Sequence, residues 1–247
     1  MDVIRIFCSQ TERYSKQSIG NPTASSKTVS TRHLAGTHLK CIKIEPMTET
    51  QSIALASDRH QVSCGVAGTG KTFISLFKAF KQMEEASKVY RKVVIIRSTV
   101  PTRDIGFLPG DENEKSAVYE EPYRDLVSTI FNRGDAYDIL KNKGIVEFRP
   151  TSFLRGLTLD NAILVVDECQ NMTLHELDTI ITRVGLDCKI YFCGDFKQSD
   201  LSVNGMKPFT SILREMDQFD IIEYGTQDIV RSDFVKSYIM ARDRLGL

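Results

Sequence analysis

From about residue 46 onward, short and nearly continuous apolar runs alternate with stretches in which apolar residues recur at helical spacing. The apolar runs predict strands over Gln61–Val66, Lys92–Arg97, Ile145–Phe148, Ala162–Val166, Lys189–Cys193 and Asp220–Tyr224. The helical stretches lie at about 71–87, 116–131, 173–183, 208–217 and 232–243. This alternation favours an α/β fold with a mostly parallel sheet covered by helices on both faces. Ligands of such sheets bind beyond the carboxyl ends of the strands, so functional residues are expected there.

The first 45 residues follow a different pattern. Residues 9–38 are rich in Ser, Thr, Asn and Gly, which predicts a loop-like arm. Ile4–Ile6 and Leu39–Ile44 alternate apolar and polar residues, so each is predicted as a short edge strand. The chain is therefore expected to divide into an arm, residues 1–45, and a domain, residues 46–247.

Charge is spread unevenly along a chain whose formal net charge is zero. Residues 1–44 carry seven basic and two acidic side chains, so this segment has a surplus of five positive charges. A basic arm on a mildly acidic body can meet phosphate backbones, or it can simply be a solvated tail. Both interpretations stay open at this point.

The overall composition, with 41% apolar and 26% charged residues, is typical of a soluble globular protein. No apolar run approaches the roughly 20 residues that a membrane helix needs, and Arg5 interrupts the only candidate for a signal-peptide core. The six cysteines include no C-x-x-C pair, which indicates reduced thiols. We therefore expect a cytoplasmic protein that does not contact membranes.

The segment Gly65–Thr72 matches the phosphate-loop pattern G-x-x-x-x-G-K-[ST] in full, after a predicted strand and before a predicted helix. Its glycines allow backbone conformations in which several N–H groups converge on one phosphate, and the following helix adds its positive end. Lys71 is expected to reach the β- and γ-phosphates, and the Thr72 hydroxyl to ligate Mg²⁺. The predicted nucleotide-binding residues are Gly65, Val66, Ala67, Gly68, Thr69, Gly70, Lys71 and Thr72.

Two carboxylates, Asp167 and Glu168, end the buried strand that begins at Ala162. Asp167 is predicted to hold Mg²⁺ together with Thr72. Glu168 is placed to orient and deprotonate an attacking water, which favours hydrolysis over transfer to another acceptor. A pair of exposed acids that cap a helix is the alternative interpretation, but the phosphate loop about 100 residues upstream favours the metal site.

Three further side chains are candidates for catalysis. Gln198 follows the strand Lys189–Cys193, which should lie between the two strands that carry the earlier motifs, and its amide is expected to contact the γ-phosphate or the water. Arg183 and Arg231 are candidate arginine fingers, acting on their own nucleotide or on that of a neighbouring subunit. Arginines more often serve as surface residues, and residues 194–198 also have the composition of an ordinary turn.

Together these segments resemble the PhoH-like family of ATPases, which are related to the ATPase core of superfamily-one helicases. The resemblance covers about residues 46–245 and rests on six segments: Gly65–Thr72, Gly106–Asp111, Asp167–Asn171, Thr182–Gly185, Gly194–Gln198 and Asp228–Arg231. The chain departs from the family pattern at Ser98, where Pro is usual, and at Cys169, where Ala is usual. Neither difference removes a charged group.

The resemblance implies a RecA-like P-loop NTPase fold with ATP and Mg²⁺ as cofactors. It further implies that Gln51, in a helix opening after Pro46, contacts adenine, and that the chain forms a homo-oligomeric ring such as a hexamer. RNA or single-stranded nucleic acid is the implied partner, with Arg97 and the loop Ser98–Asp111 near the strand. The arm is too short for a nuclease domain of the kind some members carry, so no nuclease activity is expected.

Three functions fit these observations to different degrees. The first is a nucleic-acid-dependent ATPase with helicase or translocase character, and the second is a nucleotide-dependent switch or assembly module with slow turnover. The third, a small-molecule kinase, is disfavoured because residues 101–125 carry seven acidic side chains where a kinase would need a basic lid.

Overall fold

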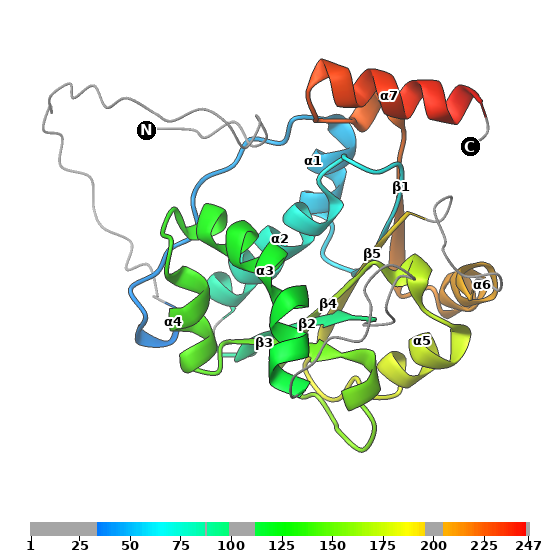
Figure 1. The fold of residues 1–247 in the computed structure, drawn as a ribbon. Coiled ribbons are helices and arrows are strands. Elements are labelled where there is room, and N and C mark those ends of the chain that lie inside the picture. Colours follow the sequence, from blue (N-terminus) through cyan, green and yellow to red (C-terminus); the bar gives the residue numbers. More distant parts are fainter. Residues whose placement is uncertain (1–33, 87, 99–111, 196–204, 246–247) are drawn as a thin grey trace, which may run out of the picture.

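The computed structural model describes residues 34–86, 88–98, 112–195 and 205–245, without the side chains of Ala35 and residues 112–117. Its centre is a six-stranded sheet with the order β3-β2-β4-β5-β1-β6, and every pairing in it is parallel (Figure 1). The strands are β1 His60–Gly65, β2 Lys92–Arg97, β3 Val146–Pro150, β4 Ala162–Asp167, β5 Lys189–Gly194 and β6 Phe219–Tyr224. The sequence prediction of a parallel sheet is confirmed, and β5 lies between β4 and β1 as expected.

Helices cover both faces of this sheet, as the near-continuous apolar strands predict. One face packs against α1 Glu49–Ala56, α2 Lys71–Glu85, α3 Glu112–Phe131 and α4 Ala136–Asn142. The other packs against α5 Leu174–Ile181 and α6 Met206–Met216. Neighbouring strand residues alternate between the two faces, so that Val165 belongs to the first hydrophobic cluster and Val166 to the second.

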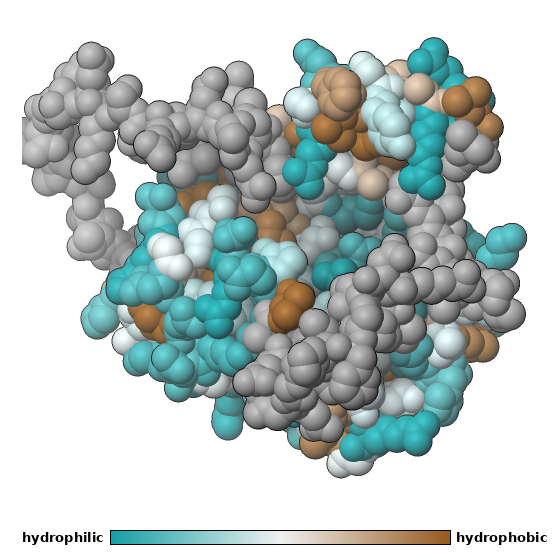
Figure 2. All heavy atoms as spheres, in the orientation of Figure 1, coloured by the Kyte–Doolittle hydropathy of each residue, from teal (hydrophilic) through white to brown (hydrophobic). Residues whose placement is uncertain are grey.

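The last helix, α7 Asp233–Arg244, differs from the others because none of its residues is buried. Phe234 is 82% exposed and Tyr238 is 65% exposed, and they lie one turn apart on the same face. Figure 2 shows hydrophobic side chains on the surface along this helix. α7 therefore carries an apolar surface that the described part of this chain does not cover.

The structure differs from the sequence predictions near the N-terminus. Leu39–Ile44 is not a strand: its Ile42 amide donates to the Ile130 carbonyl, 2.9 Å apart, at the end of α3 rather than to the sheet. Leu34, Leu39 and Cys41 are buried in the first hydrophobic cluster, so residues 34–45 are part of the packed structure rather than a separate arm. The other predicted edge strand, Ile4–Ile6, lies outside the described residues.

Helix α4 was not predicted, and its composition explains why. It has only seven residues, of which Ala136, Tyr137 and Leu140 are buried. Such a short segment gives little helical periodicity, and its stability depends on packing rather than on local preference. The helices that the sequence did predict are confirmed, and their ends agree to within four residues. Thr48 caps α1, since its side chain accepts a hydrogen bond from the Gln51 backbone N–H.

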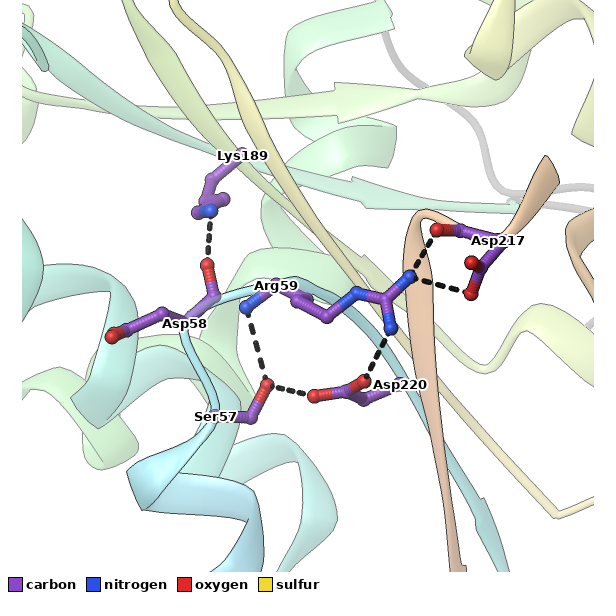
Figure 3. A network of polar contacts seen from close by, with 6 residues as sticks. All are labelled: Ser57, Asp58, Arg59, Lys189, Asp217 and Asp220. Atoms are coloured by element: carbon purple, nitrogen blue, oxygen red, sulfur yellow. Dashed lines mark hydrogen bonds and ion pairs between the residues drawn. The ribbon is translucent and has the colours of Figure 1, made fainter.

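A polar network fixes the amino ends of the strands, on the edge of the sheet opposite to the phosphate loop (Figure 3). It consists of Ser57, Asp58, Arg59, Lys189, Asp217 and Asp220. The Arg59 guanidinium pairs with two carboxylates, 3.0 Å from Asp217 and 3.5 Å from Asp220. The network joins the link between α1 and β1 to the start of β6.

Among the described residues, no helix has both the length and the apolar character that crossing a bilayer would require.

Candidate nucleotide-binding site

The phosphate loop connects the end of β1 to the start of α2, at the carboxyl edge of the sheet. Gly65 has φ +121°, and a Cβ built on it would lie 2.1 Å from the Tyr224 carbonyl oxygen. Gly68 and Gly70 also have positive φ values, 77° and 81°. Only glycine adopts these conformations without strain, so the glycines of the motif are required by the local backbone as well as by any ligand.

Lys71 lies at the first position of α2, and its ammonium group points back into the loop. Nζ donates to the carbonyls of Gly65 and Val66, at 2.9 and 2.7 Å, and lies 3.4 Å from the Thr69 hydroxyl. Burial lowers the pKa of Lys71, and the negative charges nearby, that of Asp195 first, oppose this shift. The lysine ammonium group is thus held at the centre of the loop by oxygen atoms of the loop itself. A bound phosphate would replace these oxygen atoms as its partner.

The second residue of α2 meets the end of β4. The Thr72 hydroxyl donates to Oδ1 of Asp167 at 2.8 Å, and the Tyr123 hydroxyl donates to Oδ2 at the same distance. Burial and the neighbouring charge of Glu168 raise the pKa of Asp167, while the bonds from Thr72 and Tyr123 oppose this shift. A hydroxyl and a carboxylate side by side are oxygen ligands of the kind that Mg²⁺ prefers, so these two residues fit the predicted metal site.

Glu168 directly follows β4 in a left-handed conformation, with φ 52° and ψ 38°. Its carboxylate accepts a bond from the Gln170 amide nitrogen at 2.5 Å. The amide oxygen of Gln170 in turn accepts from the Asp195 backbone N–H at 3.1 Å. Gln170 therefore links Glu168 to the end of β5.

This link depends on a close approach between two backbone segments. A Cβ on Gly194 would lie 2.7 Å from both Cys169 Sγ and the Gln170 side-chain oxygen. Gly194 is therefore required for packing. From the sequence pattern Gly-Asp alone, this glycine would be explained by a turn. Gln198 and Ser98–Asp111, apart from Ser98 itself, lie outside the described residues.

A small pocket adjoins the phosphate loop on the side of α1. It is lined by Ile44, Glu45, Met47, Gln51, Gly70, Phe73 and Ile74. Gln51 is 3% exposed, and its amide is bonded to the main chain at both ends. Its nitrogen donates to the Thr69 carbonyl at 3.0 Å, and its oxygen accepts from the Met47 amide at 2.9 Å. Gln51 thus holds the phosphate loop against α1 and lines this pocket.

The two candidate arginine fingers lie at opposite ends of the strands, Arg231 at the carboxyl ends and Arg183 at the amino ends. Arg231 is beside its own phosphate loop, since a Cβ on Gly68 would lie 2.9 Å from Arg231 Cγ, and the Val230 amide donates to the Gly68 carbonyl at 3.0 Å. Arg183 follows α5, and its carbonyl accepts from the Leu159 amide, before the start of β4. It is separated from the site by the length of β4, about 17 Å for five residue steps.

Arg97 ends β2 and is paired with Asp167 across the strands. Its guanidinium lies 5.9 Å from the Tyr119 ring centre. Burial lowers the pKa of Arg97, but the nearby Tyr123, Asp167 and Glu168 outweigh this effect and raise it. Its charge is therefore directed toward the carboxylates of the site. Sequence reasoning assigned no role to Tyr123 or Gln170. Tyr123 belongs to no motif and lies among the apolar positions of a helix, and Gln170 lies in the segment Asp167–Asn171 without a role of its own.

Comparison with known proteins agrees with this geometry. The family model described as PhoH-like protein matches residues 43–243. The chain belongs to the PhoH-like family. It is 32% identical over 212 residues to the PhoH-like protein of Bacillus subtilis, covering 83% of this chain and 65% of that one. It is 33% identical over 184 residues to the PhoH protein of Escherichia coli, covering 72% of this chain and 51% of that one.

The chain thus spans about half to two thirds of the length of these curated relatives. Among solved structures, the large terminase of a thermophilic bacteriophage matches with a TM-score of 0.50 at 13% identity, over 78% of this chain and 50% of the terminase. At that identity the likeness concerns the fold alone, and it agrees with the RecA-like P-loop arrangement of the sheet.

Proposed function

We propose that this PhoH-like chain binds ATP with Mg²⁺ and hydrolyses it. The observation that carries the proposal is the 2.8 Å contact between the Thr72 hydroxyl and Asp167 Oδ1. It joins the phosphate loop to the end of β4, although the two residues lie 95 positions apart. Phosphate-binding amides and oxygen ligands for a divalent cation thereby meet at one place, which is the arrangement that phosphoryl chemistry requires.

Each residue of the site has a role that its position supports. The loop amides and Lys71 would bind the β- and γ-phosphates, and Thr72 and Asp167 would hold Mg²⁺, which neutralises charge on the phosphates when it is bound. Glu168, held by Gln170, would orient the attacking water and accept its proton. Gln51 and the adjacent pocket would receive the base.

Arg231 is the better placed of the two arginines for the nucleotide of its own chain, because it touches Gly68. Its positive charge would stabilise the γ-phosphate as the bond to it breaks. Arg183 lies at the other edge of the sheet, so it would reach a nucleotide only in a neighbouring subunit. Gln198 keeps its proposed role as a sensor of the γ-phosphate.

We further propose that hydrolysis is coupled to RNA or single-stranded nucleic acid in a homo-oligomer. Family membership supports this coupling, together with the basic surplus of residues 1–44. The exposed apolar side chains of α7, next to the segment that touches the phosphate loop, are a surface that a second copy would cover. A slowly hydrolysing switch or assembly module is the second candidate, because it would use the same pocket.

Phosphate release measured with and without single-stranded RNA tests these proposals. The wild type should hydrolyse ATP only with Mg²⁺, and Lys71→Ala should abolish hydrolysis. Lys81→Ala, which removes a charge from an exposed position of the same helix, is the matched control and should behave like the wild type. RNA stimulation supports the coupled ATPase, and slow unstimulated turnover supports the switch. Wild-type turnover in Lys71→Ala would contradict both.

A further inference from the structure

One oxygen of Asp167 is held by a residue to which no motif assigns a role. Tyr123 lies in the middle of α3, is 1% exposed, and donates its hydroxyl proton to Oδ2 of Asp167 at 2.8 Å. The Thr72 hydroxyl donates to the other oxygen, Oδ1, at the same distance. The carboxylate is therefore fixed from two sides, by Thr72 of α2 and by Tyr123 of α3. Of these two residues, only Thr72 belongs to the phosphate-loop motif.

The direction of the bond between Tyr123 and Asp167 follows from the chemistry of the two groups. An ionised carboxylate has acceptors and no proton to donate, so the single proton of the Tyr123 hydroxyl is directed to Oδ2. Arg97, the cross-strand partner of Asp167, places a positive charge near both groups.

We infer that Tyr123 is a positioning residue for the metal-holding carboxylate. This inference rests on the proposed Mg²⁺-nucleotide function. With Oδ2 bonded to Tyr123, the Asp167 side chain cannot rotate, and Oδ1 stays beside the Thr72 hydroxyl. Removing the Tyr123 hydroxyl leaves a buried carboxylate oxygen without this partner and frees the side chain to turn. Groups that orient a metal ligand in this way typically contribute about 10- to 100-fold to metal affinity.

The test is ADP binding to the full chain by calorimetry, in EDTA and at increasing Mg²⁺ concentration. For Tyr123→Phe, affinity in EDTA should match the wild type, while the Mg²⁺ concentration that gives half of the Mg²⁺-dependent gain should rise about tenfold. A purely structural role would lower both affinities together. Tyr137→Phe is the matched control, since Tyr137 is equally buried and its hydroxyl bonds Glu120 at 3.2 Å, away from the site. It should leave the half-point unchanged.

The outcomes separate the inference from the function on which it rests. An unchanged Mg²⁺ half-point in Tyr123→Phe, or an equal loss with and without Mg²⁺, overturns the positioning role. If the ADP affinity of the wild type does not depend on Mg²⁺ concentration, the result contradicts the proposed function instead. A Tyr123→Phe chain that does not fold, while Tyr137→Phe does, also overturns the inference, because the Tyr123 hydroxyl would then serve the fold rather than the metal ligand.

Discussion

Four buried thiols should make this protein less stable at alkaline pH. Cys41, Cys64, Cys169 and Cys193 are each at most 6% exposed. Burial raises the pKa of all four, that of Cys64 to about 11. They therefore stay protonated in the folded protein at pH 9, whereas thiols in the unfolded chain ionise near pH 8.5. Their stabilising contribution is complete below about pH 8.5 and is lost as the pH rises toward the folded pKa.

The size of the effect follows from these values. Between pH 7 and pH 9, each thiol should lose about 0.8 kcal/mol of stability, or about 3 kcal/mol for the four. Two lysines oppose them: burial lowers the pKa of Lys78 to about 8, so its contribution rises over the same range by about 1 kcal/mol, and burial also lowers the pKa of Lys71. The expected net loss is about 2 kcal/mol, which is a large share of a typical stability of roughly 5–15 kcal/mol.

Urea unfolding in reducing buffer at pH 7, 8 and 9 measures this loss. Cys41→Ala isolates one thiol, because Cys41 is remote from the phosphate loop and its backbone N–H keeps its bond to Glu84. The variant should be less stable than the wild type at pH 7. Its free energy of unfolding should, however, fall by about 0.8 kcal/mol less than that of the wild type between pH 7 and pH 9. Equal wild-type stability at pH 7 and pH 9, or a loss in Cys41→Ala identical to that of the wild type, would show that the buried thiols do not cause the alkaline destabilisation.

Three further predictions concern the site. Gly65→Ala should lose about 3 kcal/mol or more in thermal unfolding, because its Cβ meets the Tyr224 carbonyl at 2.1 Å, whereas Gly134→Ala, with open space at its Cβ, should stay within about 1 kcal/mol of wild type. Glu168→Gln should slow ATP hydrolysis at least about 100-fold and keep Mg²⁺-dependent ADP binding. Arg231→Ala should slow hydrolysis without recovery when mixed with Lys71→Ala subunits, because the arginine serves its own nucleotide.

Each of these has an outcome that would count against it. A Gly65→Ala protein as stable as the wild type would mean that the loop backbone differs from the one described. Loss of ADP binding in Glu168→Gln would place that residue in binding rather than in hydrolysis. Recovery of hydrolysis in the mixture of Arg231→Ala and Lys71→Ala chains would show that the arginine acts between subunits.

The parallel sheet and the phosphate loop could be predicted from the sequence because each depends on local pattern. Apolar runs of strand length favour a buried parallel sheet, and the glycines at 65, 68 and 70 take the positive φ values that the loop needs. The contact between Thr72 and Asp167 then follows from topology, because both lie at the carboxyl ends of nearby strands.

The different positions of the two arginines are consistent with the order of helices and strands along the chain. Arg183 comes after α5, the helix that follows β4, and such a helix runs back toward the amino ends of the strands. Arg231 directly follows β6, so it stays at the carboxyl edge, beside the loop. Tyr123 could not be predicted, because only the packing of α3 brings a hydroxyl from mid-helix to Asp167. Residues 34–45 were misjudged because their few apolar side chains are buried by tertiary contacts.

A double-mutant cycle on nucleotide affinity tests the central claim, that Thr72 and Asp167 form one Mg²⁺-nucleotide site. A slowly hydrolysed ATP analogue with Mg²⁺ would be titrated calorimetrically into the wild type, Thr72→Val, Asp167→Asn and the double variant. Each single change should weaken binding, and the double variant should bind little worse than the weaker single variant, which corresponds to a coupling of at least about 1 kcal/mol. Losses that add within about 0.5 kcal/mol, or a wild type that does not bind the analogue, would contradict this claim.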